Sequence, residues 1–246
     1  MSAETYFATV QEALQRVATT QMAGIHAAAQ LLTDAIVRDQ SLFSFGATHS
    51  FMVTEELVYR TGGLMLINPI YPHGMNLSVR PMTATSRLER VLGLGAELLS
   101  ASAARSGDVL LLASTSGRNA VVIDMALEAR RKGMKTIGIT ALAYSSGVTS
   151  RHPSGKKLAD LCDLILDNGA PHGDAAVSIP GLAQKTGPLS SITSLAIVNA
   201  LVAETVRRLA EMGRTPPVFM SANLDGGDEF NARLLAENKH RIHYMD

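Results

Sequence analysis

Apolar residues occur along the chain in two patterns: short uninterrupted runs, and longer segments in which they recur every three or four positions. The central stretch 108–140 shows both in succession. Residues 109–113 form an apolar run of the length of a buried strand, and apolar positions between 121 and 129 then recur at helical spacing. Gly133 ends the helical segment before a second apolar run. The pattern predicts a strand, a loop, a helix and a second strand.

The rest of the chain alternates between the same two patterns, without an internal repeat or a linker. A segment from Tyr6 to Arg38 keeps an apolar face without proline, which predicts one long helix or two helices joined near Gly24. The stretch 68–86 holds three prolines and little periodicity, which indicates a long loop. The remaining predicted elements are strands at 42–45, 62–67 and 163–166, helices at 51–60, from 88 to 99 and at 188–212, and an irregular connection at 168–185.

Strands alternate with helices throughout, which is typical of one α/β domain. We predict a doubly wound fold in which helices cover both faces of a mostly parallel, five-stranded sheet. The domain is expected to span residues 1–246, with a lead helix at about 5–38 and a C-terminal tail at about 213–246.

The loop of the central stretch concentrates groups that bind anions. Three consecutive hydroxyl side chains, Ser114, Thr115 and Ser116, precede Gly117, which lets the backbone approach a ligand. Asn119 stands where the predicted helix begins, so free N–H groups and the helix dipole converge at this loop. An anion, most naturally a phosphate, is expected there. The alternative is an ordinary polar turn in which Asn119 or Ser116 caps the helix.

Composition narrows the class of partner. Lys plus Arg equals Asp plus Glu at 22 each, so no overall field attracts nucleic acid or an anionic membrane. The first residues lack the pattern of a secretory signal, and no run approaches the roughly 20 apolar residues of a membrane span. The single cysteine, Cys162, lies in an apolar-leaning run and cannot form a disulfide within the chain. We expect a cytoplasmic protein with neither a nucleic-acid partner nor a membrane partner.

The loop at 114–119 resembles the phosphate-binding loop of the sugar isomerase (SIS) domain, which reads Ser-x-Ser-Gly-x-Thr/Ser/Asn between a strand and a helix. Ala129, Gly133 and Thr140 match the end of that helix and the following strand. No Gly-Lys-Ser/Thr follows the loop, so a Walker A nucleotide site is not indicated. The resemblance implies that the loop binds the phosphate of a small-molecule phosphosugar.

A second turn supports the same resemblance. SIS domains end their first strand in Gly-x-x-x-Ser, which Gly46 and Ser50 match, and the resemblance implies that Ser50 contributes to the phosphate or sugar site. Both loops are expected at the carboxyl ends of parallel strands, where open α/β sheets bind ligands. The similarity covers about 41–212 and is greatest to a SIS group related to phosphoheptose isomerases and, more distantly, to N-acetylmuramic acid 6-phosphate etherases. SIS sites are commonly completed by a neighbouring subunit, which implies a homodimer or tetramer.

Candidate catalytic carboxylates follow the second turn. Glu55 and Glu56 lie one and a half helical turns beyond Ser50, and the alternative role for each is solvent-facing charge. Phosphoheptose isomerases carry Ala-Glu-Glu-Leu on this helix, similar to residues 54–57, and the resemblance implies that Glu56 is the catalytic base. SIS domains also place polar side chains that face the sugar near the next predicted helix, where Glu89 is a second candidate.

His49 and His152 are candidate proton donors, because imidazole titrates near neutral pH. His152 lies in the basic loop 151–157, where hydration of the loop is the competing role. Phosphoheptose isomerases have metal-binding histidines where this chain has Met52 and Ile192. Since a thioether is a poor zinc ligand, we expect no metal and no other cofactor.

Three functions follow from the resemblance. The first is a lyase that removes the C2 proton of a 6-phosphosugar, most naturally an N-acetylhexosamine 6-phosphate, and eliminates the C3 substituent. The second is an aldose–ketose isomerase, which begins with the same proton transfer. The third is a phosphosugar sensor without catalysis, but the lead helix is neither basic nor similar to a helix-turn-helix, which disfavours a transcription regulator. The missing histidines disfavour a zinc-dependent isomerase, so we predict metal-independent elimination.

Overall fold

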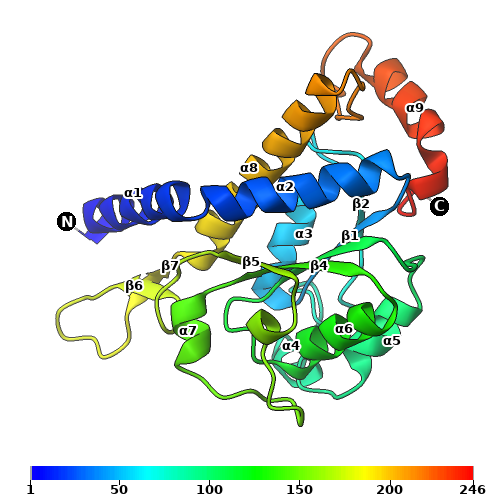
Figure 1. Cartoon of the computed structure of the whole chain (residues 1–246). Coiled ribbons are helices and arrows are strands. Elements are labelled where there is room, and N and C mark those ends of the chain that lie inside the picture. Colours follow the sequence, from blue (N-terminus) through cyan, green and yellow to red (C-terminus); the bar gives the residue numbers. More distant parts are fainter. Residues whose placement is uncertain (1, 246) are drawn as a thin grey trace.

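The computed structural model describes residues 2–245, and a sheet of five parallel strands forms its centre (Figure 1). The strands are β1 (Leu42–Gly46), β2 (Ile67–Pro69), β3 (Val109–Ala113), β4 (Lys135–Thr140) and β5 (Leu164–Asp167), in the order β2-β1-β3-β4-β5. Gly46 pairs with Ala113, and Ala113 pairs with Ile139, so the carboxyl ends of the three central strands lie level. The chain changes direction across the sheet between β1 and β3, which is where doubly wound folds bind ligands.

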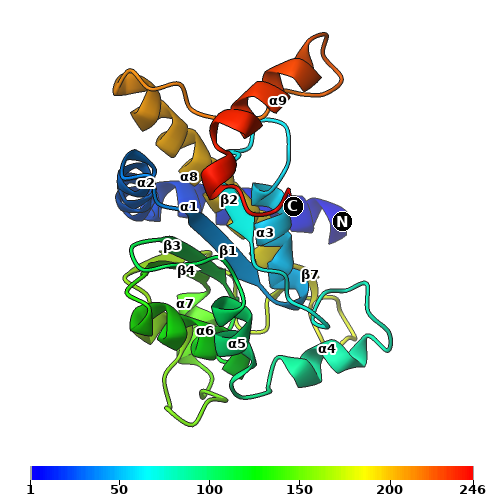
Figure 2. The ribbon, with the colours of Figure 1, turned by 90° about the vertical axis from the view of Figure 1, so that its right-hand side faces the viewer.

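Helices cover both faces of the sheet, and Figure 2 shows the two layers from the side. One layer contains α1 (Ser2–Thr20), α2 (Met22–Val37), α3 (Phe51–Leu57) and α8 (Ser190–Glu211); the other contains α4 (Thr83–Leu88), α5 (Leu94–Ser100) and α6 (Ala120–Arg131). Side chains of β1 alternate between the two layers: Leu42 belongs to the first apolar core, and Phe43 and Phe45 belong to the second. The predicted doubly wound α/β fold is confirmed.

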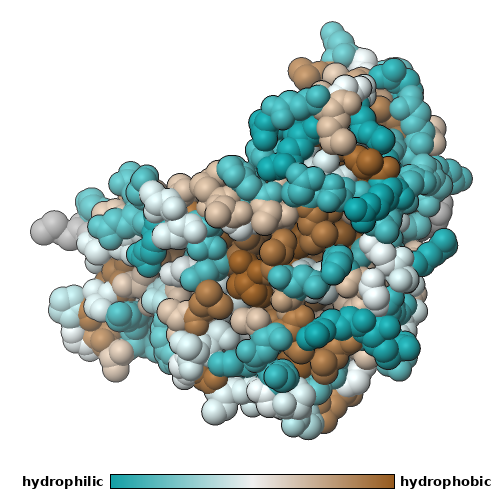
Figure 3. Space-filling view, viewed as in Figure 1, coloured by the Kyte–Doolittle hydropathy of each residue, from teal (hydrophilic) through white to brown (hydrophobic). Residues whose placement is uncertain are grey.

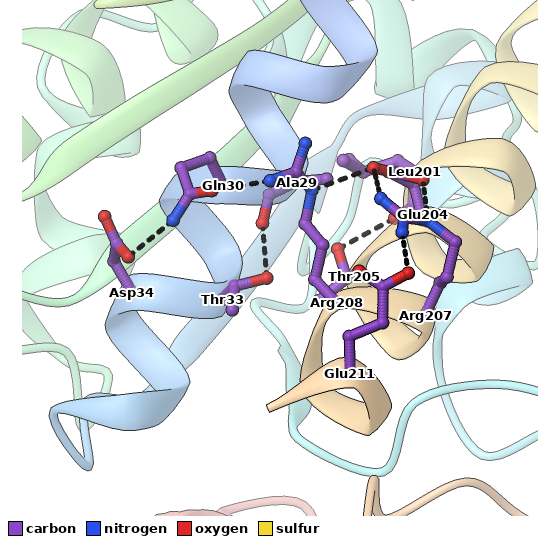
Figure 4. Close-up of polar contacts among 10 residues, drawn as sticks. All are labelled: Ala29, Gln30, Thr33, Asp34, Leu201, Glu204, Thr205, Arg207, Arg208 and Glu211. Carbon is purple, nitrogen blue, oxygen red and sulfur yellow. Dashed lines mark hydrogen bonds and ion pairs between the residues drawn. The ribbon is translucent and has the colours of Figure 1, made fainter. Parts of the chain in front are cut away.

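Helices α2 and α8 pack against each other, and polar side chains join their outer edges (Figure 4). Arg208 Nη1 donates to Gln30 Oε1 at 2.5 Å, and Gln30 Nε2 donates to Asp34 Oδ1 at 2.8 Å. Arg207 and Arg208 both donate to Glu204, and these hydrogen bonds and charges lower the pKa of that carboxyl to about 2. The polar contacts therefore lie outside two helices whose inner faces form the first core.

The lead segment forms two helices, and they separate at Gln21 rather than near Gly24. Gln21 Oε1 accepts a hydrogen bond from the amide N–H of Asp167, at the end of β5, at 2.9 Å. Gly24 lies inside α2, where an added Cβ would come 3.0 Å from Leu166 Cδ2. The glycine marks the close approach of α2 to the sheet rather than the end of a helix.

The helix predicted from 88 to 99 is also interrupted. Helix α4 ends at Leu88, α5 begins at Leu94, and Gly93 between them has a left-handed φ of +83°. The amide N–H of Gly93 donates to Asp124 Oδ2 at 2.7 Å. The apolar spacing continues across this turn, so periodicity alone did not reveal the break.

Further elements lie outside the predicted ones. Two short strands, β6 (Ala175–Val177) and β7 (Thr186–Pro188), pair antiparallel where an irregular connection was predicted. Short helix α7 (Leu142–Ser146) follows β4, and α9 (Gly227–Glu237) lies within the C-terminal tail.

The last part of the tail docks against β2 through the buried Asn68. Asn68 Nδ2 donates to the carbonyl oxygens of Leu42 and Arg241, both at 3.0 Å. Asn68 Oδ1 accepts from the amide N–H of His243 at 2.6 Å, and the His243 ring stacks on Phe43. One side chain thus joins β1, β2 and the tail.

One face of the molecule exposes apolar surface near the edge of the sheet. Figure 3 shows apolar surface gathered between α2 and α6, at the edge of the sheet where β5 has one buried residue among its four. Among residues 2–245, no helix combines the length and apolar character needed to cross a bilayer. Desolvation raises the pKa of the partly exposed Cys162 thiol to about 12, so little thiolate is present near neutral pH.

Candidate functional site

A cleft of about 430 Å³ opens at the carboxyl ends of β1 and β3. Its walls come from the turn before α3, the loop between β3 and α6, the end of α4 and the start of α8. The lining residues are Ala47, Thr48, His49, Ser50, Glu89, Ser114, Thr115, Ser116, Asn119, Tyr144, Gly173, Asp174, Pro188, Ser190 and Ser191. Both loops that were predicted to bind phosphate therefore meet in one cleft.

The loop between β3 and α6 is held by its carbonyl groups. The carbonyl oxygen of Thr115 accepts from the amide N–H of Ala141 at 2.9 Å, on the side of β4. The carbonyl oxygens of Gly117 and Arg118 accept from amide N–H groups of the segment 148–158, at 2.9 and 2.8 Å. A trans peptide group points its N–H opposite to its C=O. The amide N–H groups that follow these three carbonyls therefore point away from β4 and the 148–158 segment.

These amide donors belong to Ser116, Arg118 and Asn119, and within the described residues 2–245 none of them has a hydrogen-bond acceptor. Gly117 has a left-handed φ of +62°, and a Cβ there would come 3.2 Å from Leu158 Cβ and from Thr140 Oγ1. The left-handed conformation favours glycine at this position, and a side chain would press against both neighbouring atoms. The loop presents free donors at the N-terminus of α6, which is an arrangement suited to an anion.

The turn after β1 faces the same cleft. A Cβ on Gly46 would lie 2.2 Å from the carbonyl oxygen of Ser50, so the chain can fold back tightly only with glycine there. Thr48 has a left-handed φ of +53°, and its amide N–H donates to the carbonyl oxygen of Met75 at 2.8 Å. An unfavourable conformation held in place by a tertiary contact is typical of functional sites. His49 and Ser50 follow it directly and line the cleft.

The Asn119 side chain makes no capping hydrogen bond to α6. It connects the loop to a carboxyl group instead. Asn119 Oδ1 accepts from Arg151 Nη1 at 2.8 Å, and Asn119 Nδ2 donates to Glu89 Oε2 at 2.6 Å. Since a guanidinium group only donates, Arg151 fixes the oxygen side of the amide. The NH₂ side of Asn119 is thereby directed at Glu89.

Glu89 lies half-buried in the wall of the cleft. Burial raises the pKa of Glu89 above its ordinary value, and hydrogen bonds from Asn119 and Thr48 only partly offset this. A carboxylate with a raised pKa is a stronger base at neutral pH than a solvated one. The cleft therefore holds a carboxyl group that is able to act as a base, beside the loop with free amide donors.

The opposite wall is the start of α8, whose N-terminus is already neutralised. Asp174 Oδ1 accepts from the amide N–H groups of Leu189 and Ser190 at 3.1 and 2.7 Å, and its Oδ2 accepts from the Ser190 hydroxyl at 2.7 Å. A carboxylate at a helix N-terminus occupies the donors that an anionic ligand would use. Sequence reasoning missed Asp174, because no local pattern links it to a helix that begins at Ser190.

Three candidate catalytic residues lie outside the cleft lining. Glu56 accepts from Asn199 Nδ2 at 2.7 Å, on the side of α8, and pairs with Arg60. Glu55 lines a separate pocket of about 160 Å³. His152 Nε2 lies 3.1 Å from Asp124 Oδ1 of α6.

The other predicted site residues lie together. The cleft lining includes His49, Ser50 and Glu89, together with the loop residues Ser114, Thr115, Ser116 and Asn119. Gly117 is not among the lining residues, and its left-handed conformation shapes the loop that carries the last four of them. Among residues 2–245, no three or more His, Cys, Asp and Glu side chains form a group that could hold a metal ion.

Comparisons with known proteins match this architecture. The family model described as SIS domain matches residues 5–141, more than half of the chain. A UPF0309 protein of Shouchella clausii is 44% identical over 242 residues, which cover 98% of each chain. A phosphoheptose isomerase of Francisella tularensis has a TM-score of 0.57 at 16% identity, over 83% of this chain and 96% of that one. The NanR protein of Vibrio vulnificus, solved with ManNAc-6P, has a TM-score of 0.53 at 16% identity, over 96% of this chain and 69% of that one. At these identities the two solved structures show a common fold.

We expect inorganic phosphate to bind the loop between β3 and α6. The double variant Ser114→Ala, Ser116→Ala removes two hydroxyl donors, so it should weaken phosphate binding about tenfold in calorimetry. The control variant Ser78→Ala, Ser221→Ala removes two hydroxyls outside the cleft lining and should bind like the parent protein. Unchanged affinity in the Ser114 and Ser116 variant would show that the anion site lies elsewhere.

Proposed function

Since the chain belongs to the SIS domain family, we propose that it is an enzyme that acts on a phosphosugar. The phosphate would bind the amide groups and hydroxyls of the loop between β3 and α6, with Ser50 on the facing turn. The name of the F. tularensis protein is that of a phosphosugar isomerase, and the V. vulnificus protein was solved with an N-acetylhexosamine 6-phosphate. The observation that carries the proposal is the position of Glu89 in the same cleft as the free amide donors.

The proposed reaction begins with proton transfer from C2 of the opened sugar to Glu89. The electron pair of the C2–H bond moves into an enolate that the C1 carbonyl group stabilises. Glu89 suits this step because burial raises the pKa of its carboxyl group, while the Asn119 amide holds one of its oxygens at 2.6 Å. The phosphate remains bound throughout and keeps C2 beside the base.

We propose elimination as the second step. The enolate electrons form the C2–C3 double bond as the C3–O bond breaks, and the leaving oxygen takes a proton. His49 lines the cleft and would supply that proton, since imidazole is protonated in part near neutral pH. An isomerase would instead return the proton from Glu89 to C1. Both reactions use the same base and differ only in the fate of the enolate.

A panel of sugar 6-phosphates, analysed by mass spectrometry, tests the reaction. Incubation with hexose, heptose and N-acetylhexosamine 6-phosphates should convert an N-acetylhexosamine 6-phosphate to a product lighter by one water. An isomerase would leave the mass unchanged but would exchange the C2 proton for deuterium in D₂O. Neither change with any sugar would contradict an enzymatic role and would favour a sensor.

Glu89→Gln should lower turnover by roughly 10²–10⁴-fold and leave phosphosugar affinity nearly unchanged, because an amide cannot accept the C2 proton. In the parent protein, turnover should fall as the pH drops through the pKa of Glu89, which lies above the ordinary value of 4.5. The measurements are kcat and its pH profile.

Glu56→Gln is the matched control. Glu56 is also a partly buried glutamate, but it contacts Asn199 and Arg60 instead of the cleft. It should keep full activity. If Glu56→Gln lost activity while Glu89→Gln kept it, the base would belong to α3, and the assignment to Glu89 would be wrong.

We also propose that two copies of the chain associate through α1. This helix has 19 residues but buries only Ala13 and Val17, and Phe7 is 67% exposed. Helices in proteins are stabilised mainly by packing of an apolar face, so α1 needs a further contact. Tyr6 of the same helix donates to the carbonyl oxygen of Pro188, which lines the cleft, so the interface would adjoin the site.

Light scattering at micromolar concentration should show at least a dimer. Phe7→Glu places a charge in the proposed interface and should shift the protein towards the monomer. Leu224→Glu changes a similarly exposed apolar side chain in the tail, 59% exposed, and should leave the mass unchanged. A parent protein that is monomeric at this concentration would exclude the association.

A further inference from the structure

Three arginines gather at one margin of the cleft. Arg151 Nη1 contacts Asn119, and the amide N–H of Arg151 donates to the carbonyl oxygen of Arg118 at 2.8 Å. Arg90 directly follows Glu89, whose carboxyl group is bound to the same Asn119. The Arg151 guanidinium group lies close enough to Arg118 and Arg90 for both of their charges to act on it.

The cluster lacks a compensating negative charge. Among residues 2–245, none of the three guanidinium groups forms an ion pair with a carboxylate. Arg118 Nη2 donates only to the Thr149 hydroxyl at 3.2 Å, and Arg118 Nε is buried without a partner. Burial and the charges of Arg118 and Arg90 lower the pKa of Arg151. Repulsion between like charges raises the free energy of this arrangement, and an anion bound between them would lower it.

The neighbouring carboxyl group of Glu89 does not serve that purpose. Glu89 accepts hydrogen bonds from Asn119 and Thr48 rather than from an arginine, and its raised pKa shows that burial outweighs the attraction of Arg151 and Arg90. The guanidinium groups therefore keep most of their donors available for a ligand.

We propose that Arg90, Arg118 and Arg151 form a subsite for a second anionic group of the substrate, a carboxylate or a second phosphate. This proposal rests on the proposed function, and it narrows the substrates named there to N-acetylhexosamine 6-phosphates that carry a second anionic substituent. Guanidinium groups bind carboxylate and phosphate through paired hydrogen bonds, which neutral sugar hydroxyls cannot replace.

The position of the cluster fits such a ligand. Glu89, Asn119 and Tyr144 all line the cleft, and Arg151 interacts with each of them. A phosphate bound to the amide groups of Ser116 and Asn119 would place the rest of the sugar chain beside Glu89. An anionic group farther along that chain reaches the margin where the arginines lie.

Calorimetry with three matched ligands tests the subsite. D-glucitol 6-phosphate, 6-phosphogluconate and D-glucitol 1,6-bisphosphate share one carbon skeleton and differ at C1, which carries a hydroxyl, a carboxylate or a phosphate. The parent protein should bind the second and third ligands about tenfold more tightly than the first. This preference should weaken at high salt, because two of the arginines are exposed.

The double variant Arg90→Gln, Arg118→Gln should bind all three ligands with the affinity of D-glucitol 6-phosphate. The double variant Arg90→Lys, Arg118→Lys keeps both positive charges and should retain part of the preference. A preference retained in this variant shows that its loss in the Gln variant comes from the lost charges and not from misfolding. Arg233→Gln, on α9, is the control and should behave like the parent protein.

The experiment distinguishes failure of the arginine subsite from failure of the phosphate site. If the parent protein bound all three ligands equally and Arg90→Gln, Arg118→Gln changed nothing, the subsite would be excluded while the phosphate site stood. If none of the three ligands bound, the phosphate assignment would fail and the subsite with it.

Discussion

The direction of a few peptide groups after β3 decides where this fold can bind an anion. The carbonyl oxygens of Thr115, Gly117 and Arg118 are held by β4 and the 148–158 segment, so the intervening amide N–H groups point the other way. The left-handed conformation of Gly117 makes this reversal possible. The 148–158 segment therefore does more than connect β4 to β5: it orients the loop whose donors face the cleft, and it carries Arg151, which orients Asn119.

Helices α6 and α8 both point their N-termini at the cleft. The carboxylate of Asp174 makes the N-terminus of α8 less attractive to an anion than that of α6. Asp174 accepts from the first amide groups of α8, whereas within residues 2–245 the amide groups of Ser116, Arg118 and Asn119, just before α6, have no acceptor. The helix dipole then favours an anion only at α6. The two ends of the cleft therefore differ. The end at the loop attracts an anion, whereas the wall at Ser190 is polar and neutral. Glu89 lies beside the anionic end, where burial keeps its carboxyl group basic.

Sequence patterns predicted those elements that depend on interactions between residues close together in the chain. The strand, loop, helix and strand around Gly117 were predicted correctly, because apolar spacing and a glycine suffice to specify them. The choice between Glu56 and Glu89 depends on long-range contacts: Glu56 meets Asn199, 143 positions away, and Glu89 meets Asn119 across a turn at Gly93 that periodicity does not reveal. The break at Gln21 and the docking of the tail on Asn68 likewise depend on partners far along the chain. Sequence patterns alone do not identify such partners.

The single thiol has a consequence for following the molecule in solution. Cys162 is the single cysteine of the chain, and its Sγ lies 3.0 Å from where a side chain on Gly138 of β4 would begin. The thiol is partly exposed, and its raised pKa leaves little thiolate near neutral pH, so a thiol reagent should react with it slowly while β4 and the segment before β5 stay packed. Faster modification would therefore report loosening of the packing around β4, the strand whose Thr140 hydroxyl donates to the Thr115 carbonyl oxygen behind the loop.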